Sequence, residues 1–461
     1  MCLGSTDLSR VRKVKALLEE TIDDLILNHR EVLCKNPSKD FIRNRDFTPE
    51  KIISTLLRYG SRNAESELID ILECQDTARN INAAFLQQRK KLGEDCMSWL
   101  FRSYTEAVFD MPALGFDKYL VKGRFILGCD GSDVNVAYNP NDPETFIPKK
   151  GKRGYNQIHL NALYDVCTGA WMSANVQGIH KKHERKALVD MIAQLKYAKQ
   201  AIITADRGYE SFNVFAACME SGASYVIRLK DIESNGIISV YDLPDDEFDT
   251  YISTKLTKRH TKETKSHPEI YTIIPHYTDF DFFNDEQIYE ISVRIVRFKL
   301  PSGSFVCLAT NLSEDEFTIA DLADLYRLRW GCEIGFRKLK YTIGLVNFHS
   351  WKREYIMQEL YARLVLFNFC AFTVKAIDNS ASTPFMDSDK DEGSRKAEKR
   401  KGTAFSQAVT VCRKLLVNKS LKFIKQAIET IKAHTFSVKS DRAFKRKVKP
   451  QSSKPFVHKP S

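Results

Sequence analysis

The stretch GRFILGCDGSDVNVAY, residues 123–138, decides the fold of this chain. Its β-branched and apolar residues predict a strand that lies inside a sheet. Asp130 interrupts the run among apolar and small neighbours, where a carboxylate is costly unless something binds it. A turn or surface position for Asp130 is an equal alternative, and Asp133 follows three positions later. The residues alone therefore leave open which acid has a function.

The elements that follow have an informative order. Strand-like runs at 155–169 and 170–179 are separated by turn chemistry and indicate an antiparallel meander. The chain then alternates between helix and strand, at 183–196, 200–206, 210–222 and 223–231. Three antiparallel strands followed by α-β-α-β is the order of the RNase H-like fold. We therefore expect an α/β core, a mixed five-stranded sheet with flanking helices.

This sheet would bring two distant acids together. Asp206 closes the buried strand 200–206, and α/β folds place ligands at the carboxyl ends of parallel strands. The first and fourth strands of an RNase H-like sheet are neighbours. Asp130 and Asp206 are therefore expected to be adjacent.

The segment before this core, 1–115, is predicted to be helical. Thr48 is placed as an N-cap, Pro49 as the first helical residue and Gly60 as a stop. A further helix, in 81–93, ends in polar and basic residues. Short helices of this kind predict either a helix-turn-helix-like DNA reader or an ordinary helical bundle. The two alternatives stay open at this point.

The rest of the chain divides into segments that differ in expected secondary structure and composition. We expect the first part of the core at 116–230, a β-rich insertion at 231–312 and the second part of the core at 313–378. The insertion includes a hairpin that turns at the sequence PSGS. Residues 379–461 read as a polar linker, one helix from about 404 to 434 and a basic tail.

Composition favours a soluble intracellular protein. The 11 cysteines are scattered and spell neither a zinc knuckle nor a disulfide framework, which fits a reducing cytoplasm. The N-terminus lacks a signal-peptide core, and the apolar run from Leu364 is too short to cross a bilayer. The net charge is +11, and residues 395–461 hold 19 Lys and Arg against 3 acids. Such a tail suits a polyanion such as DNA, although a solubilising or disordered tail has the same composition.

A second decisive stretch is YRLRWGCEIGFRKLKY, residues 326–341. On a regular helix with about 100° per residue, its acid and three of its polar residues share one narrow face. These residues are Tyr326, Arg329, Glu333 and Lys340. An apolar stripe beside this face is predicted to pack on the sheet and consists of Leu325, Leu328, Phe336 and Leu339. The helix would thus bring Glu333 to the edge that holds the two aspartates.

Three clustered carboxylates repel one another unless cations neutralise them. Asp130, Asp206 and Glu333 offer hard oxygen ligands, which select Mg²⁺ or Mn²⁺. Two such ions about 4 Å apart activate a water or a 3′-hydroxyl and stabilise the leaving oxygen in phosphodiester transfer. Arg329 could grip a flanking phosphate in a bidentate manner, and Lys340 could act as a point charge.

The spacing Y-(2)-R-(3)-E-(6)-K of residues 326–340, with CDGSD and TADRGYE before it, resembles the DDE transposases of bacterial insertion sequences. The likeness is to the insertion-sequence-four family, which carries a YREK signature. AFLQQRKKLG and QELYARLVLFNF also look like flanking segments of that family, and the resemblance covers residues 41–374. The match to the DGS sequence favours Asp130 over Asp133.

The resemblance implies a function for each matched position. Asp130, Asp206 and Glu333 correspond to the catalytic triad that binds two Mg²⁺ or Mn²⁺ ions. Three further positions, Tyr326, Arg329 and Lys340, correspond to contacts with DNA phosphates, and Arg337 is a fourth candidate contact. The family binds the terminal inverted repeats of its element, cleaves there and joins the 3′-hydroxyl ends to target DNA. A synaptic homodimer in the bacterial cytoplasm, associated with the nucleoid and not with a membrane, is implied as well.

Some family members form a hairpin intermediate with the help of an aromatic residue that stacks a flipped base. The β-rich insertion contains no tryptophan, so this function would fall to Tyr251, Phe282 or Phe283. Two alternative functions stay open. One is a stand-alone RNase H-like nuclease, and the other is an inactive relative that only binds element ends.

Other conspicuous residues are given plainer interpretations. Asp165 is expected to cap a β-turn, and His180 and His183 are expected to be solvated residues at a helix start, because no partner pair completes a zinc site. Trp330 and Trp351 are expected to be packing residues. The cluster of charges at 395–401 either contacts DNA or is solvated.

Overall fold

The computed structural model describes residues 5–43, 45–72, 81–377 and 401–437 of the chain. Its centre is a sheet in which five strands have the predicted order β4-β3-β1-β5-β6. β1 pairs antiparallel with β3 and parallel with β5, and β5 pairs parallel with β6. These strands are β1 (Phe125–Val136), β3 (Lys152–Asp165), β4 (Ala170–Gly178), β5 (Ala201–Ala205) and β6 (Ser224–Leu229). The mixed α/β architecture is confirmed.

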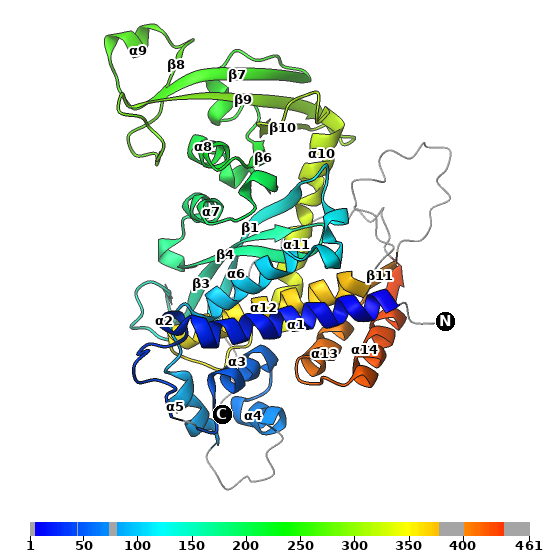
Figure 1. Ribbon diagram of the computed structural model, residues 1–461. Helices are drawn as coiled ribbons and strands as arrows, with labels where there is room; N and C mark the ends of the chain where they lie inside the picture. Colours follow the sequence, from blue (N-terminus) through cyan, green and yellow to red (C-terminus); the bar gives the residue numbers. More distant parts are fainter. Residues whose placement is uncertain (1–4, 44, 73–80, 378–400, 438–461) are drawn as a thin grey trace.

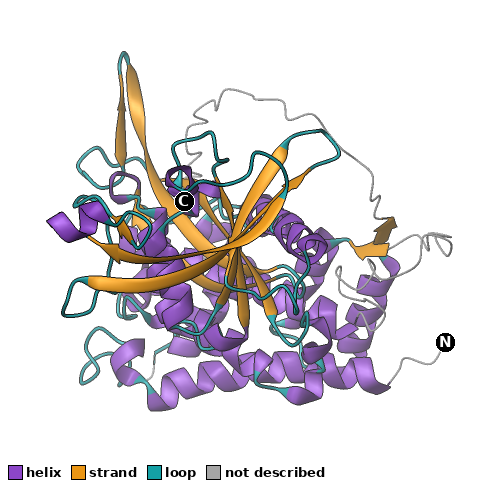
Figure 2. Ribbon diagram, turned by 90° about the horizontal axis from the view of Figure 1, so that it is seen from above, coloured by secondary structure: helices purple, strands orange, loops and turns teal. Residues whose placement is uncertain are grey.

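The sheet is larger than predicted, with ten strands where we expected five. β2 (Phe146–Lys149) adds to β3, and four strands of the β-rich insertion continue the sheet beyond β6. They do so because β10 pairs antiparallel with the open edge of β6, in the order β10-β9-β7-β8. These strands are β7 (Phe248–Thr257), β8 (Tyr271–Ile273), β9 (Ile288–Lys299) and β10 (Phe305–Thr310). Figure 2 shows the twist of the strands, seen from above.

Helices cover both faces of the central strands. Alternate side chains of a strand point to opposite faces. Leu127 and Ile203 lie in a core with α7 and α8, whereas Ile126 and Ile202 lie in a core with α6 and α12. The four helices are α6 (Cys96–Phe109), α7 (Glu184–Ala193), α8 (Phe212–Glu220) and α12 (Arg353–Ile377). α12 is apolar enough to cross a membrane, but 83% of its most apolar window is buried inside the protein, as in a central core helix.

The N-terminal helices are α1 (Ser5–Asn28), α2 (Arg30–Leu33), α3 (Pro49–Arg58), α4 (Ala64–Leu72) and α5 (Ile81–Arg89). Of these, α1 and α3 pack on α12, while the other three pack against α1 or α3 (Figure 1). Thr48 caps α3 by accepting a hydrogen bond from the Lys51 N–H, and Pro49 is the first helical residue, as predicted. α3 ends at Arg58, shortly before Gly60.

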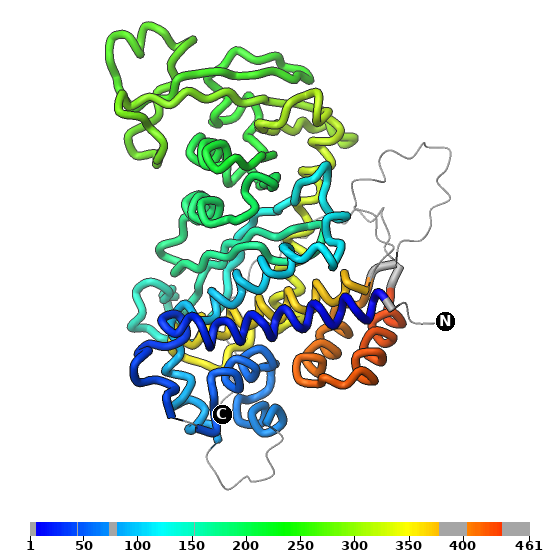
Figure 3. The backbone as a smooth tube through the Cα atoms, viewed as in Figure 1, coloured from blue at the N-terminus to red at the C-terminus, as the bar shows by residue number. Residues whose placement is uncertain are grey.

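The C-terminal region differs from the single helix that we predicted. It forms a helical hairpin, because the chain leaves α13 after Leu415 and Ser420 caps the start of a second helix. The elements are β11 (Lys401–Thr403), α13 (Phe405–Leu415), α14 (Leu421–Ala433) and β12 (Thr435–Ser437). Figure 3 shows this hairpin beside α1 at the opposite end of the sequence. The nine cysteines of the described ranges are buried and free.

Candidate active site

A cavity of about 680 Å³ opens at one edge of the central strands and brings together all seven predicted site residues. The acids come from three separate elements, and cations surround them. The lining residues are Asp130, Gly131, Ser132, Asp206, Arg207, Arg228, Tyr326, Arg329, Trp330, Glu333, Phe336, Arg337, Lys340 and Tyr341.

Parallel pairing explains why two acids that are distant in sequence meet here. The register of β1 with β5 ends at Gly128 opposite Thr204, and each strand then presents its aspartate two residues later. The Gly131 N–H donates to Asp130 Oδ1 at 2.8 Å, and the Gly208 N–H donates to Asp206 Oδ1 at 2.8 Å. Each carboxylate is therefore oriented by a backbone amide one or two residues further along the chain.

Glycine allows the third acid to approach the strands. α11 (Trp330–Arg337) carries Glu333 and packs on β1 and β3. A Cβ at Gly128 would lie 3.1 Å from Cys332 Cβ, and one at Gly335 would lie 2.9 Å from the Tyr164 ring. Both distances are too short for a larger side chain without displacement of α11. The small residues thus hold α11 close to the sheet and Glu333 close to the aspartates.

The stretch 326–341 is not the single regular helix that we predicted. α10 (Ile319–Leu328) ends before Arg329, α11 follows, and the six residues Lys338–Ile343 form a π-helix, labelled η7. The wider turn of η7 changes the angular spacing after residue 337. Lys340 nevertheless lines the cavity with Tyr326 and Glu333.

The surroundings of Asp130 oppose the ionisation of its carboxyl group. Burial raises the pKa of this carboxyl to about 6. The negative charges of Asp206 and Glu333 also raise this pKa, while the Gly131 N–H and the Arg329 guanidinium oppose them. Burial is the largest of these effects, so the site opposes the ionisation of Asp130 chiefly by shielding its carboxyl group from water.

Arg329 and Lys340 line the cavity together with the acids, Arg329 as a buried side chain and Lys340 as a partly buried one. Arg329 is 5% exposed, and its Nη2 lies 3.7 Å from Glu333 Oε1. Its guanidinium carbon is 5.6 Å from the centre of the Tyr326 ring, and its buried Nε has no hydrogen-bond partner. Lys340 Nζ donates to the Asp133 carbonyl at 2.6 Å, and burial lowers the pKa of Lys340. Both cations retain hydrogen-bonding capacity toward the cavity.

Asp133, the acid that the residues alone could not exclude, is engaged elsewhere. His159 Nδ1 lies 2.6 Å from Asp133 Oδ1, and Nε2 of the same ring lies 3.1 Å from Glu184 Oε1. Burial opposes the charge of His159, but these two carboxylates outweigh the burial and raise the pKa of His159. Asp133 therefore has the His159 ring as a close partner, whereas Asp130 faces the cavity.

The donor set of the cavity suits a hard divalent cation. Three carboxylates line it, and the pKa of Asp130 is raised mainly by burial, an effect that a bound cation would oppose by favouring the charged carboxylate. Within the described residues, no group of three His, Cys, Asp or Glu side chains already has the spacing of a metal site. The carboxylates would thus have to close around an ion.

Two cations of the cavity, Arg207 and Arg228, were missed from the sequence. Arg207 directly follows Asp206, and Arg228 lies on β6, the strand beside β5. The signal for Arg228 was the same as for Asp130, because a charge in a buried strand is costly without a partner. Trp330 also lines the cavity and is 50% exposed, and Trp351 is 56% exposed, so the prediction that both are packing residues was wrong.

Several residues that stood out in the sequence lie outside the cavity and make local contacts within the fold. Asp165 accepts hydrogen bonds from the N–H groups of Cys167 and Thr168, as predicted for a turn cap. His183 caps α7, and His180 contacts the Phe146 carbonyl. Tyr251 is exposed on β7, while Phe282 and Phe283 pack against other aromatic rings. The charge cluster 395–401 lies almost entirely outside the described residues.

Arg89, one of the basic residues at the end of the helix in 81–93, does not lie on the surface as a contact of a DNA reader would. It was placed in the basic end of the third N-terminal helix, yet it is 1% exposed and donates hydrogen bonds to Gln358 and Ser350 beside α12. It also pairs with Glu359 at 3.1 Å. Arg89 therefore anchors α5 inside the protein and is not available to DNA.

Comparison with known proteins gives one family match and several distant relatives. The family described as "Transposase DDE domain" matches residues 126–369, more than half of the chain. InsL of insertion sequence element IS186A from Escherichia coli (strain K12) and the transposase for insertion sequence element IS421 from Escherichia coli are each 35% identical over 66 residues. This stretch is 14% of the chain and only 18% of each relative.

A solved structure is also similar at low identity. It is the cryo-EM structure of the piggyBac transposase synaptic complex with hairpin DNA, at 12% identity and a TM-score of 0.37. The alignment covers 92% of this chain and 85% of that chain.

Proposed function

Because this chain belongs to the transposase DDE domain family, we propose that it binds the terminal inverted repeats of a bacterial insertion sequence and cleaves the DNA there. We further propose that it joins the freed 3′-hydroxyl ends to target DNA, as in the insertion-sequence-four family. One observation carries the proposal. Three carboxylates from β1, the end of β5 and α11 face a single cavity that five cations also line.

The charges of the cavity match a nucleic-acid strand. A phosphodiester carries a negative charge at each nucleotide, and arginine and lysine side chains neutralise it. Arg329 Nη2 lies 3.7 Å from Glu333 Oε1, and the charge of Arg329 opposes the rise that burial causes in the pKa of Asp130. Burial lowers the pKa of Lys340, an effect that the charge of Asp130 partly offsets. We assign both cations to phosphates that flank the scissile bond. Arg207, Arg228 and Arg337 are assigned to phosphates farther along the strand.

Asp130, Asp206 and Glu333 are the residues that would hold two Mg²⁺ or Mn²⁺ ions. When bound, such ions supply an activated water or 3′-hydroxyl and a counter-charge for the leaving oxygen. The chain itself contributes orientation, because backbone amides fix one oxygen of each aspartate. The contact of Arg329 with Glu333 holds the third acid beside them. Tyr326, against the Arg329 guanidinium, restricts where that cation can move.

We also propose how the protein assembles and where it binds the repeats. Two element ends must be processed together, so we propose a homodimer in the synaptic complex, acting in the bacterial cytoplasm on chromosomal DNA. The N-terminal helices are proposed to bind the repeats through surfaces other than Arg89. Single-molecule counting of protein on paired ends tests the dimer, and finding only monomers there would contradict it.

Cleavage of a labelled duplex that carries the element's own terminal repeat tests the proposed function. Wild-type protein should cut at the repeat boundary with Mg²⁺, not with Ca²⁺, and Glu333→Gln should lower the rate by at least about 10³-fold. Asp324→Asn is the matched control, because Asp324 lies on α10 outside the cavity and pairs with Arg327. It should cut like the wild type.

The alternatives give different results in the same assay. Equal cutting of DNA without the repeat would indicate a stand-alone nuclease. Salt-sensitive binding without cutting, under conditions where paired ends assemble, would indicate an inactive end-binding protein.

A further inference from the structure

The π-helix η7 (Lys338–Ile343) is the least regular element of the cavity wall and carries Lys340. A π-turn is rare and is often found at a functional site. It ends at Gly344, whose φ of +100° lies in the left-handed region that favours glycine. Since a π-turn has weaker internal geometry than an α-helix, contacts outside η7 must hold it in place.

The first of these contacts is on the catalytic strand. Lys340 Nζ donates to the Asp133 carbonyl of β1 at 2.6 Å. This bond fixes the middle of η7 to the strand that presents Asp130. It does not fix the end of η7.

The end of η7 is held by the C-terminal hairpin. Arg413 Nη2 on α13 donates to the Ile343 carbonyl at 3.0 Å and to the Tyr59 carbonyl at 3.2 Å. The start of η7 also contacts α13, because Lys338 Nζ lies 4.9 Å from the centre of the Phe405 ring. One helix thus contacts both ends of η7, and one guanidinium joins η7 to the loop that follows α3.

α13 is itself fixed to the opposite end of the sequence. The buried Lys15 Nζ of α1 donates to the Leu415 carbonyl at 2.6 Å and to the Leu416 carbonyl at 3.1 Å. Lys432 of α14 pairs with Asp7 at 2.6 Å. In Figure 1 the hairpin lies directly against α1. The support for η7 is therefore anchored at both ends of the hairpin.

We propose that Arg413 is a positioning residue for Lys340, and that the C-terminal hairpin is consequently part of the working active site. This inference rests on the proposed function and assigns the hairpin a place in it. The guanidinium bridges two carbonyls at fixed angles, whereas a lysine can reach only as a point donor and a methionine cannot donate. Loss of the bridge would release the end of η7 and the position of the Lys340 ammonium.

The test compares Arg413→Met and Arg413→Lys with Lys414→Met, an exposed neighbour, as the matched control. On paired repeat ends with Mg²⁺, Arg413→Met should cleave about 10- to 100-fold more slowly, with affinity for the uncut end changed less than about twofold. Arg413→Lys should recover part of the rate, and Lys414→Met should cleave like the wild type. The defect should largely disappear in a Lys340→Met background, because both changes act on one group.

Hydrogen exchange supplies a readout that does not depend on cleavage. Amides of residues 339–346 should exchange faster in Arg413→Met, while those of α6 and β1 keep wild-type protection. Unchanged exchange in 339–346, or additive rate losses with Lys340→Met, would overturn the inference. Absence of cleavage by the wild type would count against the proposed function, and exchange would still decide whether Arg413 holds η7.

Discussion

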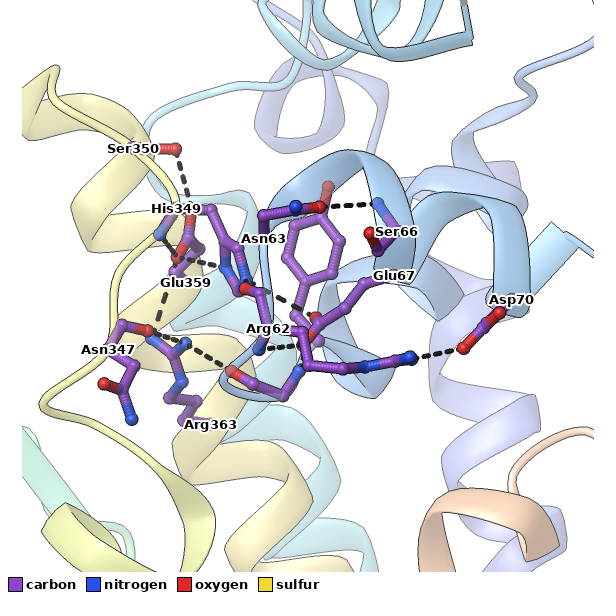
Figure 4. A network of polar contacts seen from close by, with 12 residues as sticks. Arg62, Asn63, Ser66, Glu67, Asp70, Asn347, His349, Ser350, Glu359 and Arg363 are labelled. Atoms are coloured by element: carbon purple, nitrogen blue, oxygen red, sulfur yellow. Dashed lines mark hydrogen bonds and ion pairs between the residues drawn. The ribbon is translucent and has the colours of Figure 1, made fainter. Parts of the chain in front are cut away.

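Two clusters of buried charge in this protein are built in opposite ways. One is the carboxylate cavity, and the other, here called the interhelix network, consists of Glu67, Arg89, His349, Glu359 and Arg363. In the network, His349 lies between two carboxylates, 3.4 Å from Glu67 and 3.3 Å from Glu359. Figure 4 shows Glu67, His349, Glu359 and Arg363 converging from α4, the loop after η7 and α12.

The network compensates its charges within the protein. Glu67 accepts hydrogen bonds from the N–H groups of Gly60 and Arg62, each at 2.7 Å, and Arg89 pairs with Glu359. Burial works against ionisation of Glu359, yet His349 and the two arginines outweigh it and lower its pKa. Burial opposes the charge of His349, but the neighbouring carboxylates of Glu359 and Glu67 raise the pKa of His349 to about 9.

The cavity leaves its charges incompletely compensated. The only hydrogen bond found for the Asp130 carboxylate within the described ranges comes from the Gly131 N–H, and its pKa is raised. A buried charge without a partner is costly, so a protein keeps one where a ligand completes the site. Charges that are paired within the protein are therefore expected to stabilise the fold, whereas charges without such partners are expected to bind a ligand. The following predictions test that distinction.

The largest effect on stability is expected from Glu359→Ala. The change leaves His349, Arg89 and Arg363 buried without their shared partner, and such a break costs about 3–5 kcal/mol. Urea unfolding measures it. Glu354→Ala on the same helix removes a half-exposed pair with Lys35 and should cost about 1 kcal/mol or less. Equal losses for the two variants would show that the network is not a structural unit.

A pH titration should detect the same network through His349. Its folded pKa of about 9 lies above the usual value of 6.5, so its stabilisation is complete below pH 6.5 and is lost as the pH rises through 9. Between pH 7 and pH 10 the wild type should lose about 2 kcal/mol more unfolding free energy than His349→Gln. Parallel stability curves for the two proteins would rule out a charged His349.

Removal of the charge in the cavity should stabilise the protein, whereas removal of the charge of His349 destabilises it. Asp130 has a folded pKa of about 6 against a usual 3.8, so the protein loses stability as the pH rises from about 4 to about 6 and keeps that loss at higher pH. In metal-free buffer at pH 8, Asp130→Asn should therefore stabilise the protein by about 1–2 kcal/mol, and at pH 4 the difference should vanish. Thermal unfolding at the two pH values measures it. Destabilisation by Asp130→Asn at pH 8 would place Asp130 with the structural charges.

The same distinction explains what the sequence could and could not predict. The strand order and the YREK spacing sufficed to bring Asp130, Asp206 and Glu333 together, because parallel pairing and helix packing follow from local patterns. The positions of Arg89 and Arg228 could not be predicted from the sequence. A basic residue looks the same in a sequence whether it pairs with a buried acid, as Arg89 does with Glu359, or lines a cavity, as Arg228 does. The pairing of β10 with β6 and the π-turn at Lys338–Ile343 depend on contacts between distant segments and have no local signature.

Manganese binding tests the central claim most directly. Titration of the protein with Mn²⁺, followed by the loss of the free-ion electron paramagnetic resonance signal, compares the wild type with Asp130→Asn and Asp324→Asn. The account predicts up to two ions bound per chain in the wild type and in Asp324→Asn, and loss of this binding in Asp130→Asn. Equal binding by all three proteins, or none by the wild type, would contradict the claim that the uncompensated carboxylates form a divalent-cation site.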